Sequence, residues 1–163
     1  MERLWAPWRV QYIKGEKPEG CIFCTKAAET TDEQNHVVWR GDSAYVLLNT
    51  FPYNNGHLMV APYAHVGELE ELDPAILADV MALSQDAIRV LKKEFTPQGI
   101  NVGLNLGAAA GAGVKDHLHV HLVPRWLGDT NFMPVVADVR VIPQSLDSAF
   151  RVLHRGFEEL KKG

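Results

Sequence analysis

The sequence has no long hydrophobic run, few cysteines and no excess of basic residues. No apolar stretch approaches the roughly 20 residues needed to cross a bilayer, and residues 1–9 lack the apolar core of a signal peptide. The formal net charge is −4, whereas a general nucleic-acid binder normally presents a basic face. We therefore expect a cytoplasmic protein that binds neither a membrane nor a nucleic-acid polymer.

The length and composition of the chain fit a single domain. The chain has 163 residues, of which 47% are hydrophobic and 22% charged, as in ordinary globular proteins. This length can bury a core without disulfides or metals as staples. We predict a single domain over residues 1–163, with an N-terminal aromatic arm (1–20) whose Trp5, Trp8 and Tyr12 pack onto the body.

Helical and strand patterns follow one another without regular βαβ alternation. Asp73 and Pro74 form a good helix start, and helical apolar spacing continues from there to Phe95. Residues 144–162 predict a C-terminal helix, and residues 27–35 a polar loop. The pattern favours an α+β fold, in which an antiparallel sheet packs with one long central helix and the C-terminal helix. Strands are predicted at 36–40 and 43–48, which form a hairpin, and at 57–61, 99–107, 117–125 and within 135–142.

Both cysteines lie in one C-x-x-C motif, Cys21 to Cys24. In a reducing compartment such a pair is more often a metal half-site or a redox pair than a disulfide. A thioredoxin-like motif would need a low-pKa thiol at the start of a helix. Here the motif follows the loop 14–20, which favours a metal half-site.

The most informative segment is His117-Leu-His-Val-His121, which holds three of the seven histidines. Alternation at period two predicts a strand with one apolar face and one face lined by imidazoles. Imidazole can serve as base, nucleophile or metal ligand near neutral pH. We therefore expect this strand to carry chemistry.

Two kinds of site compete for these histidines. The small-residue loop 107–113 precedes the strand, and its backbone N–H groups could approach phosphate oxygens closely. Zinc could instead bind His117, His119 and His121 with a water, or Cys21 and Cys24 with two histidines in a closed structural site. The spacing leaves these alternatives open.

The segment 54–62, His65 and the motif His117-x-His119-x-His121 together resemble the histidine triad (HIT) superfamily. The likeness extends from Leu4 to about Pro134, and the segments 4–9 and 125–132 are similar to the microbial branch of diadenosine polyphosphate hydrolases and phosphorylases. The resemblance implies a HIT-like fold, a homodimer, and an enzyme that cleaves nucleotides at the α-phosphate through a nucleotidyl-histidine intermediate.

The resemblance also implies roles for individual residues. His119 would be the nucleophile, and His121 and His57 would bond or protonate phosphate oxygens. Asn49 would bind ribose hydroxyls, and Asn105 with the backbone of Gly111, Ala112 and Gly113 would hold the phosphates. Structural zinc would be bound by Cys21, Cys24, His65 and His117, which leaves His119 free.

One segment departs from the family pattern. Residues 111–116 contain neither the glutamine nor the hydroxyl that many triad proteins place before the histidines. Phosphate contacts should therefore come mostly from the backbone. Two alternatives use the same residues: a nucleoside phosphoramidase of the histidine-triad nucleotide-binding type, and a zinc-stabilised nucleotide-binding module with little turnover.

Overall fold

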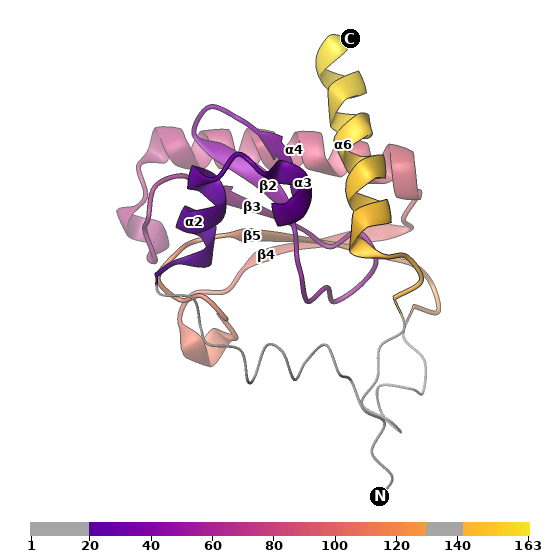
Figure 1. Ribbon diagram of the computed structural model, residues 1–163. Coiled ribbons are helices and arrows are strands. Elements are labelled where there is room, and N and C mark those ends of the chain that lie inside the picture. The colour runs from indigo at the N-terminus through magenta and orange to yellow at the C-terminus, as the bar shows by residue number, and fades with distance from the viewer. Residues whose placement is uncertain (1–19, 130–141) are drawn as a thin grey trace, which may run out of the picture.

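A five-stranded antiparallel sheet forms the centre of the computed structural model, which describes residues 20–129 and 142–163 (Figure 1). Its strand order is β1-β2-β3-β5-β4. The strands are β1 (Val37–Arg40), β2 (Ala44–Leu48), β3 (Leu58–Pro62), β4 (Gly99–Leu104) and β5 (Val120–Arg125). The helices and 3-10 turns are α2 (Ile22–Ala28), α3 (Asp32–Asn35), η1 (Leu69–Glu71), α4 (Pro74–Phe95), η2 (Ala108–Ala110) and α6 (Leu146–Lys162).

The predicted α+β fold is confirmed, and so are its long helices. The side chain of Asp73 accepts a hydrogen bond from the N–H of Ala75, which caps the start of α4 as the sequence predicts. Ser145 caps α6 in the same way by accepting from the N–H of Ser148. The predicted hairpin also forms, because β1 and β2 pair antiparallel on either side of Gly41.

Both faces of the sheet are covered, which explains why every residue of β2 and β3 is buried. On one face, Val46, Val60 and Leu122 pack with Leu91 of α4 and Phe157 of α6. The opposite face packs against α2 through a smaller cluster, Phe23, Val37, Tyr45, Leu47, Met59 and Ala61. His117, His119 and His121 also lie on this second face, because the first two rings contact Phe23 and His121 pairs with Met59. This face therefore carries the candidate site.

Three expectations need correction. Residues 27–35 do not form a loop, because α2 runs to Ala28 and α3 begins at Asp32. These helices are short and depend on tertiary contacts that a local pattern does not report. The strand β4 ends at Leu104, and β5 begins only at Val120, so His117 and His119 precede it.

Some expectations concern residues that the structure does not describe. The aromatic arm with Trp5, Trp8 and Tyr12 lies outside the described residues, as does nearly all of the predicted strand at 135–142. Among the helices that are described, none is both long enough and apolar enough to span a membrane.

Candidate functional site

A pocket of about 260 Å³ lies between α2, the ends of β2 and β3, and the loops on the same side of the sheet. Ile22, Phe23, Leu47 and Met59 contribute to its apolar wall. Asn49, His119 and His121 provide polar groups. An apolar pocket with a few convergent polar groups is the usual form of a small-molecule site.

His57 and His121 are joined by a hydrogen bond of 3.0 Å between Nε2 of His57 and Nδ1 of His121. The direction of this bond follows from the other nitrogen of His57, because Nδ1 accepts the backbone N–H of Tyr53 at 3.0 Å. The proton of His57 is therefore on Nε2, which donates to His121. His121 in turn carries its proton on Nε2 and lines the pocket as a donor.

His119 has the opposite arrangement. Its Nδ1 lies 2.8 Å from the carbonyl oxygen of His117, and a carbonyl can only accept. The proton is therefore on Nδ1, and Nε2 keeps its lone pair. The ring is 7% exposed, packs against Phe23 with centroids 4.6 Å apart, and lines the pocket. The pocket thus contains one imidazole with a free Nε2 lone pair, His119, beside a second imidazole that can donate, His121.

The surroundings keep these rings uncharged at neutral pH. Burial lowers the pKa of His57 to about 3, with smaller contributions from the charges that His121 and His119 would carry. Burial and the charge of His119 lower the pKa of His121 to about 4. Burial also lowers the pKa of His119. A neutral ring is the form in which a histidine can act as a nucleophile.

A second group of side chains lies at the start of α2. The ligand atoms of Cys21, Cys24, His65 and His117 all lie within 4.8 Å of one another, so these residues can hold a metal ion. Nε2 of His117 is 2.9 Å from the carbonyl of Pro62, which places its proton there and leaves Nδ1 as the ligand atom. Both cysteines are free thiols.

The C-x-x-C motif does begin a helix, contrary to the argument from the preceding loop. Cys21 is the N-cap of α2 and Cys24 lies in its first turn. Burial, followed by contacts with Cys21, raises the pKa of the Cys24 thiol. This direction is opposite to the depressed pKa of a redox-active thiol.

The small-residue loop contributes Gly111 and Gly113 to the pocket lining. Gly107 and Gly111 have φ of 76° and 92°, a region that favours glycine. The N–H groups of Gly111 and Ala112 donate to carbonyls inside the loop, at 3.0 and 3.3 Å. The N–H of Gly113 has no hydrogen-bond partner among the described residues. Of the N–H groups of Gly111, Ala112 and Gly113, it is therefore the one that is available to a ligand.

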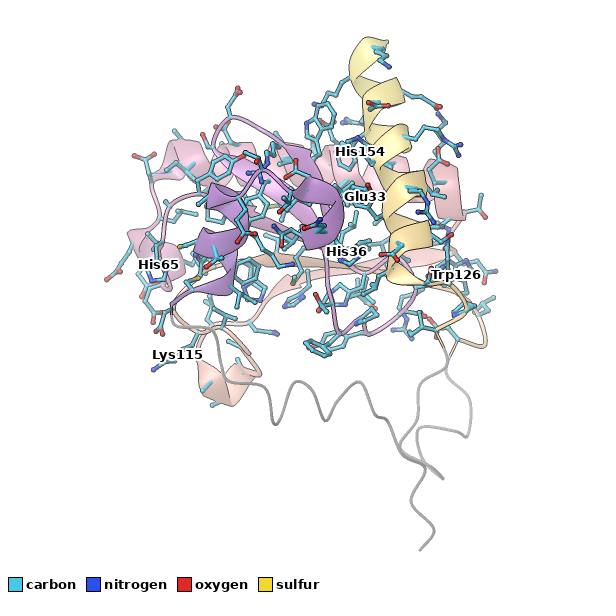
Figure 2. The ribbon with its side chains drawn as sticks, in the orientation of Figure 1. Glu33, His36, His65, Lys115, Trp126 and His154 are labelled. Atoms are coloured by element: carbon cyan, nitrogen blue, oxygen red, sulfur yellow. The ribbon has the colours of Figure 1, made fainter. Side chains whose placement is uncertain are left out.

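Some of the remaining residues considered in the sequence line the pocket and others do not. Asn49 lines the pocket, with its Nδ2 3.4 Å from Nδ1 of His57. Asn105 follows β4 and, like Ala112, is not among the residues that line the pocket. His36 bonds Asp147 on α6, and His154, itself on α6, bonds the Val38 carbonyl. Figure 2 labels both histidines, and neither is among the residues that line the pocket.

Sequence reasoning missed part of the pocket wall. Ile22, Phe23 and Lys26 line it from α2, which the sequence did not reveal as a helix. Phe51 and Tyr53 line it from the turn after β2 and are 38% and 48% exposed. Two aromatic residues in an otherwise polar turn were the available signal for that part of the wall.

The chain is similar to known proteins over most of its length. The family model described as HIT domain matches residues 30–126. A Mycobacterium tuberculosis protein named AP-4-A phosphorylase is 45% identical over 162 residues, covering 94% of this chain and 83% of the relative. An asymmetrical bis(5'-nucleosyl)-tetraphosphatase from Schizosaccharomyces pombe is 32% identical over 95 residues, or 58% of this chain and 52% of the relative.

Among solved structures, a zinc-bound histidine triad family protein from Mycobacterium smegmatis superposes with a TM-score of 0.70. The match covers 88% of this chain and 96% of that chain at 24% sequence identity. This likeness establishes the shared fold.

Proposed function

The chain belongs to the HIT domain family, and we propose that it cleaves diadenosine polyphosphates, such as diadenosine tetraphosphate, at the α-phosphate through a nucleotidyl intermediate on His119. The observation that carries this proposal is the hydrogen bond from Nδ1 of His119 to the His117 carbonyl. It leaves the lone pair of Nε2 on a ring that lines the pocket. The names of two relatives, AP-4-A phosphorylase and bis(5'-nucleosyl)-tetraphosphatase, support this substrate class.

In the first step, Nε2 of His119 attacks the α-phosphorus. An N–P bond forms, and the P–O bond to the departing nucleoside polyphosphate breaks. The Nε2–H of His121 donates to a phosphate oxygen as negative charge develops, and His57 holds His121 in the tautomer that makes this possible. We assign ribose hydroxyls to Asn49, and phosphate oxygens to Asn105 and the backbone of Gly111, Ala112 and Gly113. Within this group the N–H of Gly113 would make the direct contact, because those of Gly111 and Ala112 are bonded inside the loop.

The second step depends on the acceptor that attacks the phosphoramidate on His119. Water would give AMP and ATP from diadenosine tetraphosphate, whereas inorganic phosphate would give ADP and ATP. The relative that shares 45% identity with this chain is named a phosphorylase, which favours phosphate. We therefore propose phosphorolysis as the main reaction.

The direct test is chromatographic product analysis on diadenosine tetraphosphate, with and without inorganic phosphate. ADP that forms only when phosphate is present would establish phosphorolysis. AMP and ATP in both reactions would establish hydrolysis. If neither reaction turns over, nucleoside phosphoramidates are the next substrate, and failure there would leave a nucleotide-binding module.

We also propose that the metal bound by Cys21, Cys24, His65 and His117 is zinc. Tetrahedral bonds of about 2.3 Å to sulfur and about 2.05 Å to nitrogen separate S and N ligands by about 3.6 Å and two N ligands by about 3.3 Å. Three of the four Sγ–Nδ1 distances are 3.3, 3.4 and 3.6 Å, and the two Nδ1 atoms lie 3.3 Å apart. With four protein ligands the metal would stabilise the fold. We also propose a cytoplasmic location, which suits the reduced thiols of Cys21 and Cys24.

A homodimer formed through the edge of the sheet is the remaining proposal. Strand β4 lies at the end of the strand order, and Val102 on it is 47% exposed. An exposed edge strand offers unpaired N–H and C=O groups to another chain. Light scattering should report a dimer for the native protein and a monomer for Val102→Lys; a monomeric native protein would contradict the proposal.

A further inference from the structure

Helix α2 forms one wall of the pocket but has little stability of its own. It has seven residues, and no side chain caps its start. Isolated helices shorter than about 12–15 residues are marginal in water. Its Phe23 ring contacts the ring of His119, and Ile22 and Lys26 also line the pocket. The shape of the pocket therefore depends on the contacts that hold α2 in place.

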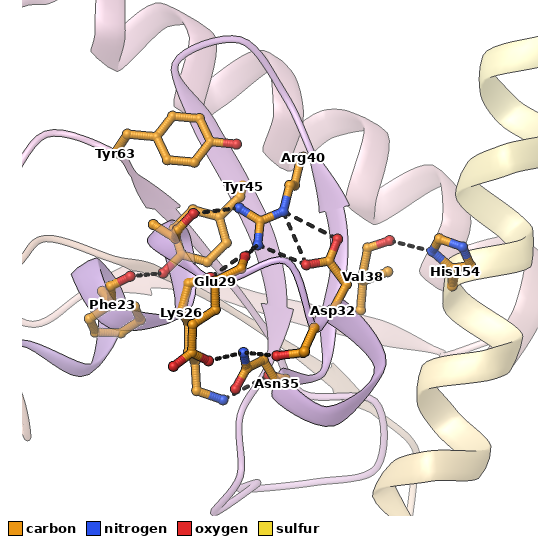
Figure 3. Close-up of polar contacts among 12 residues, drawn as sticks. Phe23, Lys26, Glu29, Asp32, Asn35, Val38, Arg40, Tyr45, Tyr63 and His154 are labelled. Carbon is orange, nitrogen blue, oxygen red and sulfur yellow. Dashed lines mark hydrogen bonds and ion pairs between the residues drawn. The ribbon is translucent and has the colours of Figure 1, made fainter. Parts of the chain in front are cut away.

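Arg40 on β1 supplies several of these contacts at the end of α2, as Figure 3 shows. Its Nη1 donates to the carbonyl of Ala27 at 2.7 Å, and its Nη2 donates to the carbonyls of Lys26 at 3.0 Å and Glu29 at 2.6 Å. The last four carbonyls of a helix lack partners within the helix, and a cation there also complements the helix dipole. Arg40 thus satisfies groups that α2 cannot satisfy itself.

Asp32 on α3 fixes the orientation of this guanidinium. The Nε of Arg40 lies 3.1 and 3.2 Å from the two carboxylate oxygens, and Nη2 lies 2.7 Å from Oδ1. A bidentate pair of this kind restricts the orientation of the guanidinium more than a single hydrogen bond does. Arg40 is therefore held by its own strand and by α3 while it binds the end of α2.

Two further hydrogen bonds hold α2 at positions before its end. The hydroxyl of Tyr45 donates to the carbonyl of Phe23 at 2.7 Å. The ammonium of Lys26 donates to the carbonyl of Asn35 at 2.7 Å. The Tyr45 bond reaches the middle of α2 from the sheet, whereas Arg40 joins its end to both the sheet and α3. Arg40 itself is not among the residues that line the pocket.

We infer that Arg40, oriented by Asp32, is a positioning residue that sets the affinity of the pocket for nucleotides by fixing the place of α2. The inference rests on the proposed function for the identity of the ligand. It predicts that Arg40 acts on binding and not on the chemical step, because α2 supplies Ile22, Phe23 and Lys26 to the pocket wall but none of the three histidines. Lysine cannot replace it, since a single ammonium lacks the planar fork that reaches three carbonyls and a carboxylate.

The test is Arg40→Lys, assayed well below its melting temperature. We expect KM for diadenosine tetraphosphate to rise about tenfold, as for the loss of one or two net hydrogen bonds, while kcat stays within about twofold. The dissociation constant of AMP, measured by calorimetry, should rise by the same factor. The matched control is Arg89→Lys on α4, whose guanidinium pairs with Asp86 and should leave both quantities unchanged.

Asp32→Asn is the second variant, because it keeps Arg40 and its three carbonyl bonds. It should raise KM less than Arg40→Lys does, and it decides the question if Arg40→Lys does not fold. A lower melting temperature with unchanged KM and AMP affinity in the folded variants would overturn the inference. A fall in kcat at constant KM would also overturn it.

A third measurement separates this inference from the proposed function. The amides of Thr25 and Glu29 are bonded within α2 and its cap, and Arg40→Lys should speed their hydrogen exchange. If the native protein neither cleaves dinucleotides nor binds AMP, the proposed function fails, and unchanged exchange in the variant would overturn the inference separately. If the native protein binds and cleaves but the variant matches it, the inference alone fails.

Discussion

The segment from His117 to His121 contributes to two groups of histidines, one beside the cysteines and one in the pocket. The two groups differ in the hydrogen-bond partners of their ring nitrogens. At the start of α2, the Nδ1 atoms of His65 and His117 lie 3.3 Å apart beside two thiols. In the pocket, Nε2 of His57 and Nδ1 of His121 lie 3.0 Å apart. The second pair is a donor and an acceptor and needs nothing between them. The first surrounds a point with ligand atoms that could hold a cation.

The difference comes from the other nitrogen of each ring. His117 donates through Nε2 to the Pro62 carbonyl, so its Nδ1 lone pair joins the thiols. His119 donates through Nδ1 to a carbonyl, so its lone pair is on Nε2. The role available to a histidine is therefore set by a backbone group on the far side of its ring.

The largest expected effect is on the pocket group. His119→Ala should reduce turnover of diadenosine tetraphosphate at least about 10³-fold, because the proposed nucleophile is lost. AMP binding and the melting temperature should change little. The matched control is His154→Ala, whose ring bonds the Val38 carbonyl away from the pocket. Equal activity in His119→Ala and the native protein would remove His119 from the mechanism.

On the metal group, Cys24→Ser should act on stability first. Loss of one ligand should cost at least about 3 kcal/mol of metal-linked stability, which corresponds to a fall of roughly 6–12 °C in melting temperature for a chain of this length. The measurement is calorimetry together with metal content, with Thr25→Ser as a neighbouring control. If chelated native protein keeps its melting temperature, these four residues do not form a structural metal site.

A smaller effect should follow His57→Phe, which removes the donor to His121 and keeps an aromatic ring. His121 would then adopt either tautomer, and kcat should fall about tenfold, as for the loss of one net hydrogen bond. The control is His36→Phe, since His36 bonds Asp147 on α6 and does not line the pocket. An unchanged kcat in His57→Phe would show that the His57–His121 bond does not direct the proton.

The smallest effect concerns pH. The pKa values of His57 and His121 are lowered by burial to about 3 and about 4, so these rings stay neutral in the fold while the unfolded chain takes up protons below about 6.5. Their contribution therefore makes stability fall as pH drops from about 6.5 towards 4. The loss in melting temperature between pH 7 and pH 5 should be smaller in His57→Phe than in the native protein. An equal loss would contradict the lowered pKa of His57.

The elements predicted best were those with a long or strongly periodic pattern. The helix from Pro74 to Phe95 shows many turns of apolar spacing and a local cap, so its sequence suffices. Helix α2 was missed because its seven residues are held from outside, by Arg40 and Tyr45. No pattern within residues 21–28 contains that information.

The sequence by itself determined which residues were available: three alternating histidines, a C-x-x-C pair, a glycine-rich loop and a turn that ends at His57. Period two also placed His119 and His121 on the face opposite the buried Val120 and Leu122. Only the tertiary structure decided which ring nitrogen carries each proton and which histidine joins the cysteines. Those choices depend on groups far away in the chain, such as Pro62 for His117 and His57 for His121, and folding alone brings them within hydrogen-bond distance.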